Sequence, residues 1–220
     1  MLEQLRNLLK NKLQNKKVLL GILLIIILLA VILGWLFFKS ADKAMPDKDG
    51  VLRYSTSNPS RKRPDDKYNW QGKPRDPKKI VIPAINVNAY IQKVGVDQNK
   101  EVAVPNNLYL VGWFVDTVIP GEKGLSIIDG HVTGRINDGV FKNLIQLNDG
   151  DEFTIEYGNG EYNQFRVVEK KSLPKEQSAA VIFSQKPNIE NQLNLVTCSG
   201  QFDAKTRSYS ERLVVVSEKI

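Results

Sequence analysis

The pattern of hydrophobic and polar positions divides the chain into three parts. An unbroken run of 21 uncharged residues, mostly leucine and isoleucine, extends from Val18 to Phe38. At about 1.5 Å per residue, a helix of this length spans a hydrocarbon core of about 30 Å. Residues 39–77 show weak apolar periodicity, and from residue 78 short apolar runs are separated by Gly, Asn, Asp or Pro. The pattern therefore predicts a transmembrane helix over 18–38, a linker over 39–77 and a folded domain over 78–220.

The folded domain is predicted to be mainly β. Turn signals such as Asp149-Gly150 and Gly158-Asn159-Gly160 separate its apolar runs,. The best helical candidate, Val140 to Leu147, is short. Seven or eight short strands in about 140 residues favour a small closed β-barrel. The expected strands are Lys79–Pro83, Ala89–Val94, Ser126–Asp129, Glu152–Tyr157, Gln164–Lys170, Leu193–Thr197 and Leu213–Val216.

The linker is expected to be an extended tether. It holds half of the ten prolines of the chain, and Ser, Asn, Lys and Asp fill much of the rest. Such a segment buries too little apolar surface to offset its chain entropy. Trp70 is its one candidate for docking on the domain.

Basic residues predict the orientation in the membrane. The first 17 residues hold five bases and one acid, so by the positive-inside rule this tail stays in the cytoplasm and the domain is exported,. A cleaved signal peptide has a shorter apolar core, so the helix is expected to be a retained anchor. The remaining residues carry 26 bases and 23 acids, a balance of +3 out of the total of +7. This small excess does not indicate a nucleic-acid partner, whereas the basic tail suits anionic lipid.

The chain has one cysteine, Cys198, and one histidine, His131. An exported domain with a single cysteine forms no internal disulfide, so the thiol is buried, paired with another chain or used chemically. Both residues end predicted strands, where a reactive side chain is held rigidly at a cleft. The pair indicates a thiolate nucleophile with an imidazole partner. The alternative is a buried structural cysteine.

The chain contains, in order, Val81 to Ile85, Gly130-His131 after an apolar strand, Leu195 to Cys198, and Arg212 before a final strand. This ordered set of motifs resembles that of sortases, the membrane-anchored cysteine transpeptidases of bacterial surfaces. Gly112-Trp113-Phe114 with Pro120-Gly121, and the run Thr197 to Asp203, are most similar to class F or class E sortases. The chain departs from the common pattern at Asp129, where small or apolar residues are frequent, and at Ser199, where glycine is frequent. The matching residues are Val81 to Ile85, Gly130-His131, Phe141, Leu144, Gly150-Asp151, Leu195 to Cys198, and Arg212.

The resemblance implies a sortase-like closed β-barrel that acts on an LPXTG-like sorting signal. Cys198 would attack the Thr–Gly carbonyl of the signal and form a thioacyl enzyme, which an amine or water then resolves. His131 would protonate the leaving amine and deprotonate the incoming one. Arg212 would hold the signal peptide and the developing oxyanion. The expected substrate-binding residues are Thr197, Ser199 and Gly130.

Arg212 is favoured over Arg207 as the acting arginine. Arg212 directly precedes the apolar run Leu213–Val216, which should lie beside the Cys198 strand, whereas Arg207 lies in a polar, turn-like stretch. A guanidinium stays protonated and offers a planar fork of donors to an oxyanion. Asp129 is a candidate to orient His131, although a role in a turn or a surface hydrogen bond is the favoured interpretation.

Two further segments bear on substrate and cofactor. The long connection from Ser172 to Gln192 is expected to shape selectivity for the signal, as the corresponding loop does in sortases. Four carboxylates near residue 150 lack a ligand-like spacing, so no calcium site and no other cofactor is expected. These carboxylates belong to Asp149, Asp151, Glu152 and Glu156.

The expected partners follow from the same resemblance. They are surface proteins with a C-terminal sorting signal, an amine of a peptidoglycan precursor or a pilin, and the membrane around the N-terminal helix. Two other functions remain open at this point. One is a noncatalytic exported domain for adhesion or scaffolding, and the other is an L,D-transpeptidase-like cysteine enzyme.

Overall fold

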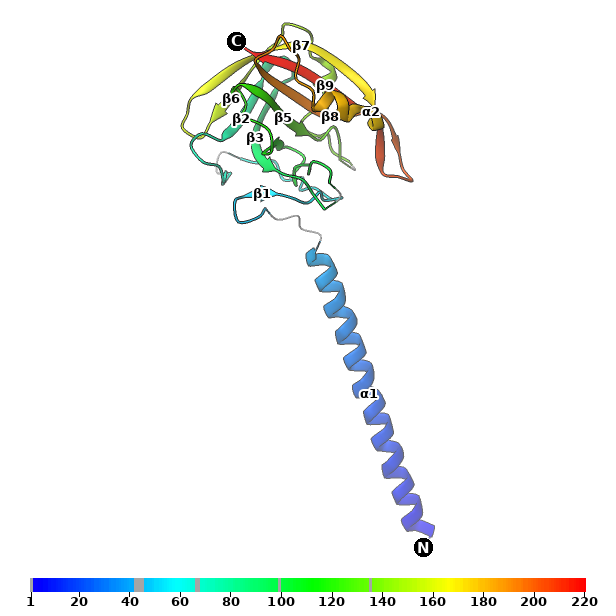
Figure 1. The fold of residues 1–220 in the computed structure, drawn as a ribbon. Coiled ribbons are helices and arrows are strands. Elements are labelled where there is room, and N and C mark those ends of the chain that lie inside the picture. Colours follow the sequence, from blue (N-terminus) through cyan, green and yellow to red (C-terminus); the bar gives the residue numbers. More distant parts are fainter. Residues whose placement is uncertain (1, 42–45, 66–67, 99, 135) are drawn as a thin grey trace. The chain divides into compact units, whose positions relative to one another are not determined.

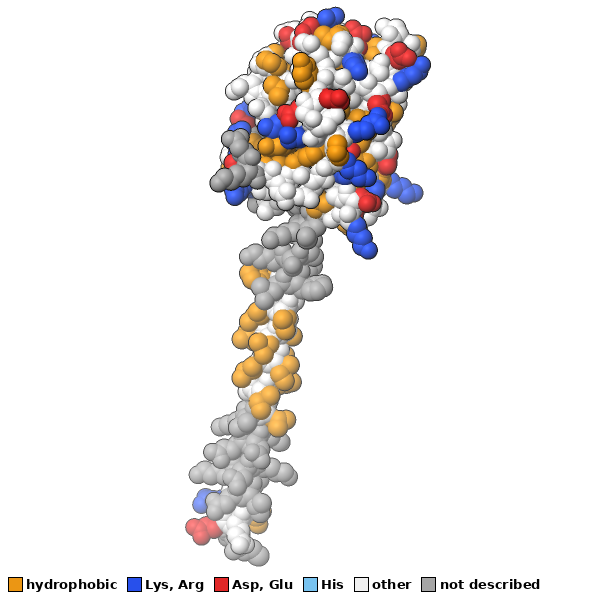
Figure 2. Space-filling view, turned by 90° about the vertical axis from the view of Figure 1, so that its left-hand side faces the viewer, with side chains coloured by type: hydrophobic (Ala, Val, Ile, Leu, Met, Phe, Trp, Pro, Cys, Tyr) orange, Lys and Arg blue, Asp and Glu red, His pale blue; other side chains and the backbone are white. Residues whose placement is uncertain are grey.

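The chain forms two compact units, residues 1–43 and 44–220. The computed structural model describes residues 2–41, 46–65, 68–98, 100–134 and 136–220, and within the first unit it describes the side chains of residues 3–6 and 19–35. The first unit is helix α1 (Leu2–Ala41). Between Leu19 and Trp35 its large apolar side chains are exposed, and they appear orange in Figure 2. Over the described residues, no helix combines the length and apolarity needed to cross a membrane.

The second unit contains the closed β-barrel that the alternating pattern predicted (Figure 1). Eight of its strands, counted over the described residues, follow the order β3-β2-β6-β7-β9-β8-β5-β4, and β4 pairs back with β3 to close the ring. Most neighbours are antiparallel, but β3–β4 and β5–β8 are parallel. A short strand, β1, adds to β3 in parallel. The strands are β1 (Val51–Leu52), β2 (Pro77–Ile82), β3 (Val87–Val94), β4 (Val111–Phe114), β5 (Gly124–Gly130), β6 (Glu152–Tyr157), β7 (Tyr162–Pro174), β8 (Asn191–Asp203) and β9 (Ser208–Lys219).

Alternation along each strand fills the barrel interior with apolar side chains. The fully buried rings of Phe153 and Phe165 stack there with centroids 5.5 Å apart. A second apolar cluster covers the outer face of β5, β8 and β9, and the partly buried Val181 and Ile182 of helix α2 (Lys175–Ile182) pack against it. These strands are therefore buried on both faces. This explains continuous apolar runs such as Leu213–Val216.

The structure corrects three local predictions. The helix expected over 140–147 is only a 3-10 turn, η2 (Leu144–Gln146), because the residues before it form turns. Strand β4 was not predicted, since all four of its residues are buried and show no alternation. The connection over 172–192 contains the end of β7, helix α2 and the start of β8. A second 3-10 turn, η1 (Pro83–Ile85), follows β2.

Parts of the predicted linker lie on the barrel. Val51 and Leu52 of β1 are buried, with 6% and 0% of their surface exposed. Ser60 forms an isolated bridge with Asn107, in the connection between β3 and β4. Further along, the indole Nε1 of Trp70 donates a hydrogen bond to the carbonyl of Ile91 at 3.0 Å. Trp70 therefore docks on β3.

Candidate active site

Strand register brings the two unique residues and Arg212 to one level of three neighbouring strands. Cys198 on β8 lies directly opposite Arg212 on β9. On the other side of β8, the parallel strand β5 pairs Asp129 with Val196. His131, two residues beyond Asp129, therefore reaches the level of Cys198. Parallel pairing of β5 and β8 is what places the ends of both strands together.

Cys198 and Arg212 share the outer face of the barrel. On β5, β8 and β9, Ile128, Leu195 and Leu213 belong to the interior cluster, whereas Ile127, Val196 and Val214 belong to the outer cluster. Because successive side chains of a strand point to opposite faces, Cys198, Arg212 and Asp129 lie on the outer face, and His131 directly follows the end of β5, two residues after Asp129,. Cys198 is a free thiol that is partly exposed there.

The His131 ring is held by a backbone carbonyl. Its Nε2 lies 2.7 Å from the carbonyl oxygen of Pro105, in the connection between β3 and β4. A carbonyl only accepts, so Nε2 carries the proton and Nδ1 is the basic nitrogen of the neutral ring. Burial lowers the pKa of His131, and the bond to Pro105 opposes this in part. The ring is therefore neutral at pH 7.

Burial also raises the pKa of the Cys198 thiol. The positive charges of Arg212 and, to a smaller extent, Lys175 lower this pKa. The negative charge of an ionised Asp129 raises it further. A raised thiol pKa beside a lowered imidazole pKa favours a resting pair in which both groups are neutral. Attack by sulfur then requires the thiol to give up its proton.

Arg212 is half-buried and turned toward its own strand. Its Nη1 donates to the carbonyl oxygens of Tyr209 at 3.2 Å and Glu211 at 2.9 Å. The guanidinium has further N–H donors on Nε and Nη2. Arg207, in contrast, is exposed in the turn between β8 and β9, with a φ of 53°.

The three predicted substrate-binding residues occupy different settings. The hydroxyl of Thr197 donates to the carbonyl of Gly130 at 2.7 Å, so this pair joins β8 to β5 just before the level of Cys198. A side chain at Gly130 would collide with the rings and methyl groups of Phe141 and Val140. The hydroxyl of Ser199 is buried and has no hydrogen-bond partner among the described residues.

Asp129 lies neither in a turn nor in a surface hydrogen bond. It is part of β5, and its Oδ1 is buried without a hydrogen-bond partner in the described part of the chain. The Asp129 carboxyl has room there because the residue paired with it on β4 is Gly112. A Cβ at that position would collide with Oδ1. Burial raises the pKa of Asp129 well above the usual range, which favours the neutral form.

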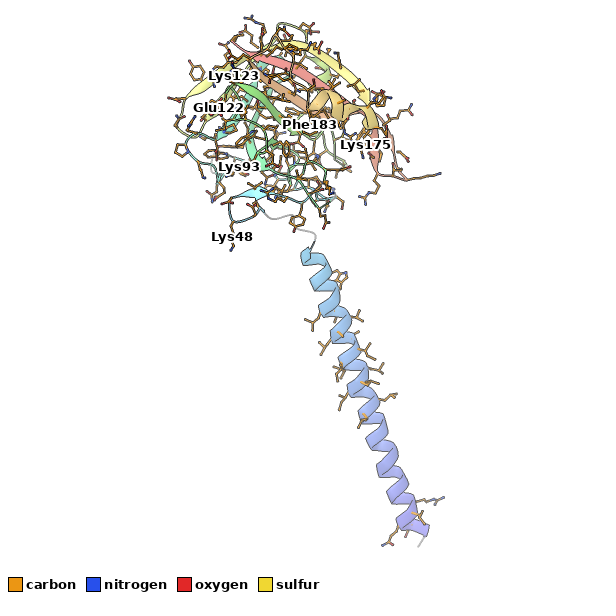
Figure 3. All side chains as sticks on the ribbon, viewed as in Figure 1. Lys48, Lys93, Glu122, Lys123, Lys175 and Phe183 are labelled. Atoms are coloured by element: carbon orange, nitrogen blue, oxygen red, sulfur yellow. The ribbon has the colours of Figure 1, made fainter. Side chains whose placement is uncertain are left out.

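Sequence reasoning missed two groups beside the site. Lys175 begins α2, where Figure 3 labels it, and its ammonium group lowers the pKa of the Cys198 thiol. Pro105 contributes only a backbone carbonyl, which no side-chain pattern marks. Beyond α2, the rings of Phe183 and Phe114 form an edge-to-face contact with centroids 6.1 Å apart. Phe183 therefore helps to bury the outer face.

The carboxylates considered for calcium mostly have protein partners. Glu152 pairs with Arg166 at 3.1 Å and Glu156 with Lys78 at 2.8 Å. Asp151 accepts a hydrogen bond from the amide of Asn148. In the described part of the chain, no three His, Cys, Asp or Glu side chains are grouped so that they could hold a metal ion.

Comparison with known families identifies the domain. The sortase domain model matches residues 80–220. The chain belongs to the sortase family. This match begins inside β2 and runs to residue 220, and it includes the Cys198, His131 and Arg212 positions. Among curated proteins, none matches the sequence of this sortase significantly.

Solved structures of sortase A share the fold. Sortase A from Corynebacterium diphtheriae is 23% identical, the match covers 68% of this chain and 63% of that one, and the TM-score is 0.51. A lid mutant of that protein is 24% identical, with 64% and 68% covered and a TM-score of 0.50. Sortase C-1 from Actinomyces oris is 28% identical, with 66% and 75% covered and a TM-score of 0.48. The resemblance of this sortase to class F or class E stays a prediction.

Proposed function

We propose that this sortase is a membrane-anchored cysteine transpeptidase that cleaves an LPXTG-like sorting signal and transfers the surface protein to an amine. The observation that carries the proposal is the position of Cys198, His131 and Arg212 at one level of three adjacent strands. A thiol, an imidazole and a guanidinium supply a nucleophile, a proton carrier and an oxyanion donor, respectively.

In the first half-reaction, Cys198 would attack the Thr–Gly carbonyl of the signal. Because the resting pair is neutral, Nδ1 of His131 takes the thiol proton as the new S–C bond forms. Arg212 donates hydrogen bonds to the carbonyl oxygen, which becomes negatively charged in the tetrahedral intermediate. Collapse of that intermediate breaks the C–N bond, and His131 gives its proton to the leaving amine of the glycine.

In the second half-reaction, an amine would resolve the thioacyl enzyme. His131, neutral again, accepts a proton from the incoming amine as its nitrogen attacks the thioester carbonyl. The S–C bond then breaks, and the thiolate recovers the proton. The acceptor we propose is an amine of a peptidoglycan precursor or a pilin, and water in its place would give hydrolysis.

Mass spectrometry of the full-length protein tests this function. The protein is incubated with a library of LPXTG-like peptides, and the products are analysed before and after an amine acceptor is added. We expect a covalent adduct on Cys198 that the amine converts to a transfer product. A folded protein that cleaves no peptide of the library contradicts the proposal and favours a noncatalytic role.

Arg212→Lys should lower kcat/KM by at least about tenfold, which corresponds to ~1.4 kcal/mol of lost transition-state stabilisation. Lysine keeps the charge but loses the planar fork of donors. The matched control is Arg207→Lys, in the exposed turn, which should change kcat/KM by less than about threefold. Both variants are measured on one peptide, and the reverse order of effects would move the arginine role to Arg207.

The proposed anchor is the segment from Val18 to Phe38. Its support is the uninterrupted apolar sequence, the basic tail before it and the exposed apolar side chains of α1 from Leu19 to Trp35. Exposed apolar surface of this extent is costly in water and favourable in lipid. We propose a cytoplasmic tail over 1–17 and an extracytoplasmic catalytic domain over 78–220, which places the enzyme where surface proteins and wall precursors meet it.

A topology reporter fused after residue 220 should be active outside the cytoplasm. The five bases of the first 17 residues hold the N-terminus inside by the positive-inside rule, and a single span then exports the rest,. Fusions of a periplasm-type and a cytoplasm-type reporter are compared in cells. Activity of only the cytoplasmic reporter would overturn both the orientation and the surface substrate.

A further inference from the structure

The hydrogen bond that sets the tautomer of His131 comes from the connection between β3 and β4. Pro105, which accepts from Nε2, lies between β3 and β4. Proline has no N–H, so its own amide cannot anchor it to a neighbouring segment. The orientation of its carbonyl is therefore set by the residues on either side. The amide of Asn106, which shares a peptide plane with that carbonyl, donates to Oε1 of Gln92 on β3 at 3.2 Å, and the amide of Val104 donates to the hydroxyl of Ser55 at 3.3 Å.

The residues that follow Pro105 are hydrogen-bonded to the N-terminal segment of the folded unit. We call residues 51–63 the strap. The amide of Ser60 donates to the carbonyl of Asn106 at 2.8 Å, and the amide of Leu108 donates to the carbonyl of Ser60 at 2.9 Å. The side-chain Nδ2 of Asn107 donates to the carbonyl of Lys62 at 2.9 Å. Three bonds thus hold the strap to the residues that directly follow Pro105.

Asn107 is the side chain that joins the two segments. It is buried, with 8% of its surface exposed. Its Oδ1 accepts from the amide of Tyr109 at 2.9 Å, which fixes the side chain and aims Nδ2 at the strap. A buried amide that loses one partner leaves polar atoms unsatisfied, so this contact is costly to break.

The strap is itself fixed to the barrel. Val51 and Leu52 pair with Lys93 and Val94 of β3, and Leu52 belongs to the same outer apolar cluster as Val196 of β8. At its far end, the guanidinium of Arg63 lies 4.3 Å from the ring centre of Tyr109. The strap therefore connects a rigid strand to the loop that holds the histidine.

We propose that the strap positions His131 for proton transfer, with Asn107 as the positioning residue. Contacts of Asn107 and Ser60 hold the Pro105 carbonyl against Nε2, which keeps the proton on that nitrogen and leaves Nδ1 for exchange with Cys198. The strap supplies no reacting group. The effect on turnover rests on the proposed transpeptidase function, whereas the effect on the tautomer does not.

The test compares full-length Asn107→Ala and Asn107→Asp with wild type. Aspartate keeps the acceptor for the Tyr109 amide, but its carboxylate cannot donate to Lys62 and repels that carbonyl, so it breaks the contact with the strap. It serves if the alanine variant fails to fold. The matched control is Asn159→Ala. The Oδ1 of Asn159 likewise accepts from a backbone amide, that of Glu161, in the exposed turn between β6 and β7.

Two measurements are made on each variant. Because His131 is the only histidine, the ¹⁵N signals of its ring report the tautomer without ambiguity. Peptide cleavage gives kcat and KM separately. We expect both Asn107 variants to show a mixture of tautomers and a kcat lowered about tenfold, with KM within about twofold, as for loss of one neutral hydrogen bond. The Asn159→Ala variant should match wild type in both measurements.

The outcomes separate the two proposals. Unchanged ring-nitrogen signals in both Asn107 variants overturn the positioning role, whatever happens to kcat. A change of tautomer with an unchanged kcat in an active enzyme overturns it as well. If wild type cleaves no peptide, the transpeptidase proposal fails, while the ring-nitrogen signals still decide whether the strap sets the tautomer.

Discussion

Replacing Cys198 with alanine should abolish covalent capture of the sorting-signal peptide and leave the fold intact. No other thiol exists in the chain to form a thioacyl bond. The substitution removes one sulfur atom from a partly exposed strand position, which costs about 1 kcal/mol or less of stability. Thermal unfolding checks the fold, and mass spectrometry of the enzyme–peptide mixture checks the adduct.

The control is Cys198→Ser, which keeps the shape and a hydrogen-bonding group but offers a much weaker nucleophile. It should fold like wild type and give no adduct on the time scale of wild-type turnover. Survival of a covalent adduct in Cys198→Ala would remove this residue from the nucleophile role.

His131→Ala should lower kcat by about 10²–10⁴, the usual contribution of a positioned general acid–base group. The thiol proton then has no carrier, and the leaving amine has no donor. Cys198 should remain open to a small alkylating reagent, measured above neutral pH because burial raises the pKa of the thiol. Added imidazole should restore part of the turnover, since it can carry the proton through solvent.

A matched variant, His131→Gln, keeps an N–H donor near Pro105 but cannot exchange protons at neutral pH. It should be as slow as His131→Ala. Transpeptidation at the wild-type rate in either variant would exclude His131 from the mechanism. If the thiol of His131→Ala also resisted alkylation, the loss of turnover would reflect a disturbed site rather than a missing proton carrier.

Much of the barrel could be predicted because alternation marks strands with one face in the interior. The prediction over Glu152–Tyr157 matches β6 residue for residue. The far ends of β8 and β9 were not predicted, because residues 200–207 form an exposed polar hairpin end that buries no apolar face. Helix α2 was not predicted either. It has only eight residues, which is too short to show a clear apolar stripe,.

In the candidate site, too, residues with a distinctive side chain could be predicted, whereas strand register and backbone contacts could not. Cys198 and His131 stand out because each is unique, and Arg212 because it precedes an apolar strand. The register of β5 with β8 follows from tertiary pairing across 67 residues, as the bond from Thr197 to Gly130 illustrates. The Pro105 carbonyl could not be predicted, because every residue carries a carbonyl and the turn that aims this one depends on the strap.

The short strand β1 also protects an exposed backbone edge. β2 pairs with β3 only over residues 87–90, and β1 pairs with residues 93 and 94. Because β4 occupies the opposite edge of the same residues, β1 covers the stretch that β2 leaves. An open stretch of strand edge recruits strands from other molecules and promotes aggregation. By covering residues 93 and 94, β1 leaves less open edge with which a strand of another copy of this enzyme could pair.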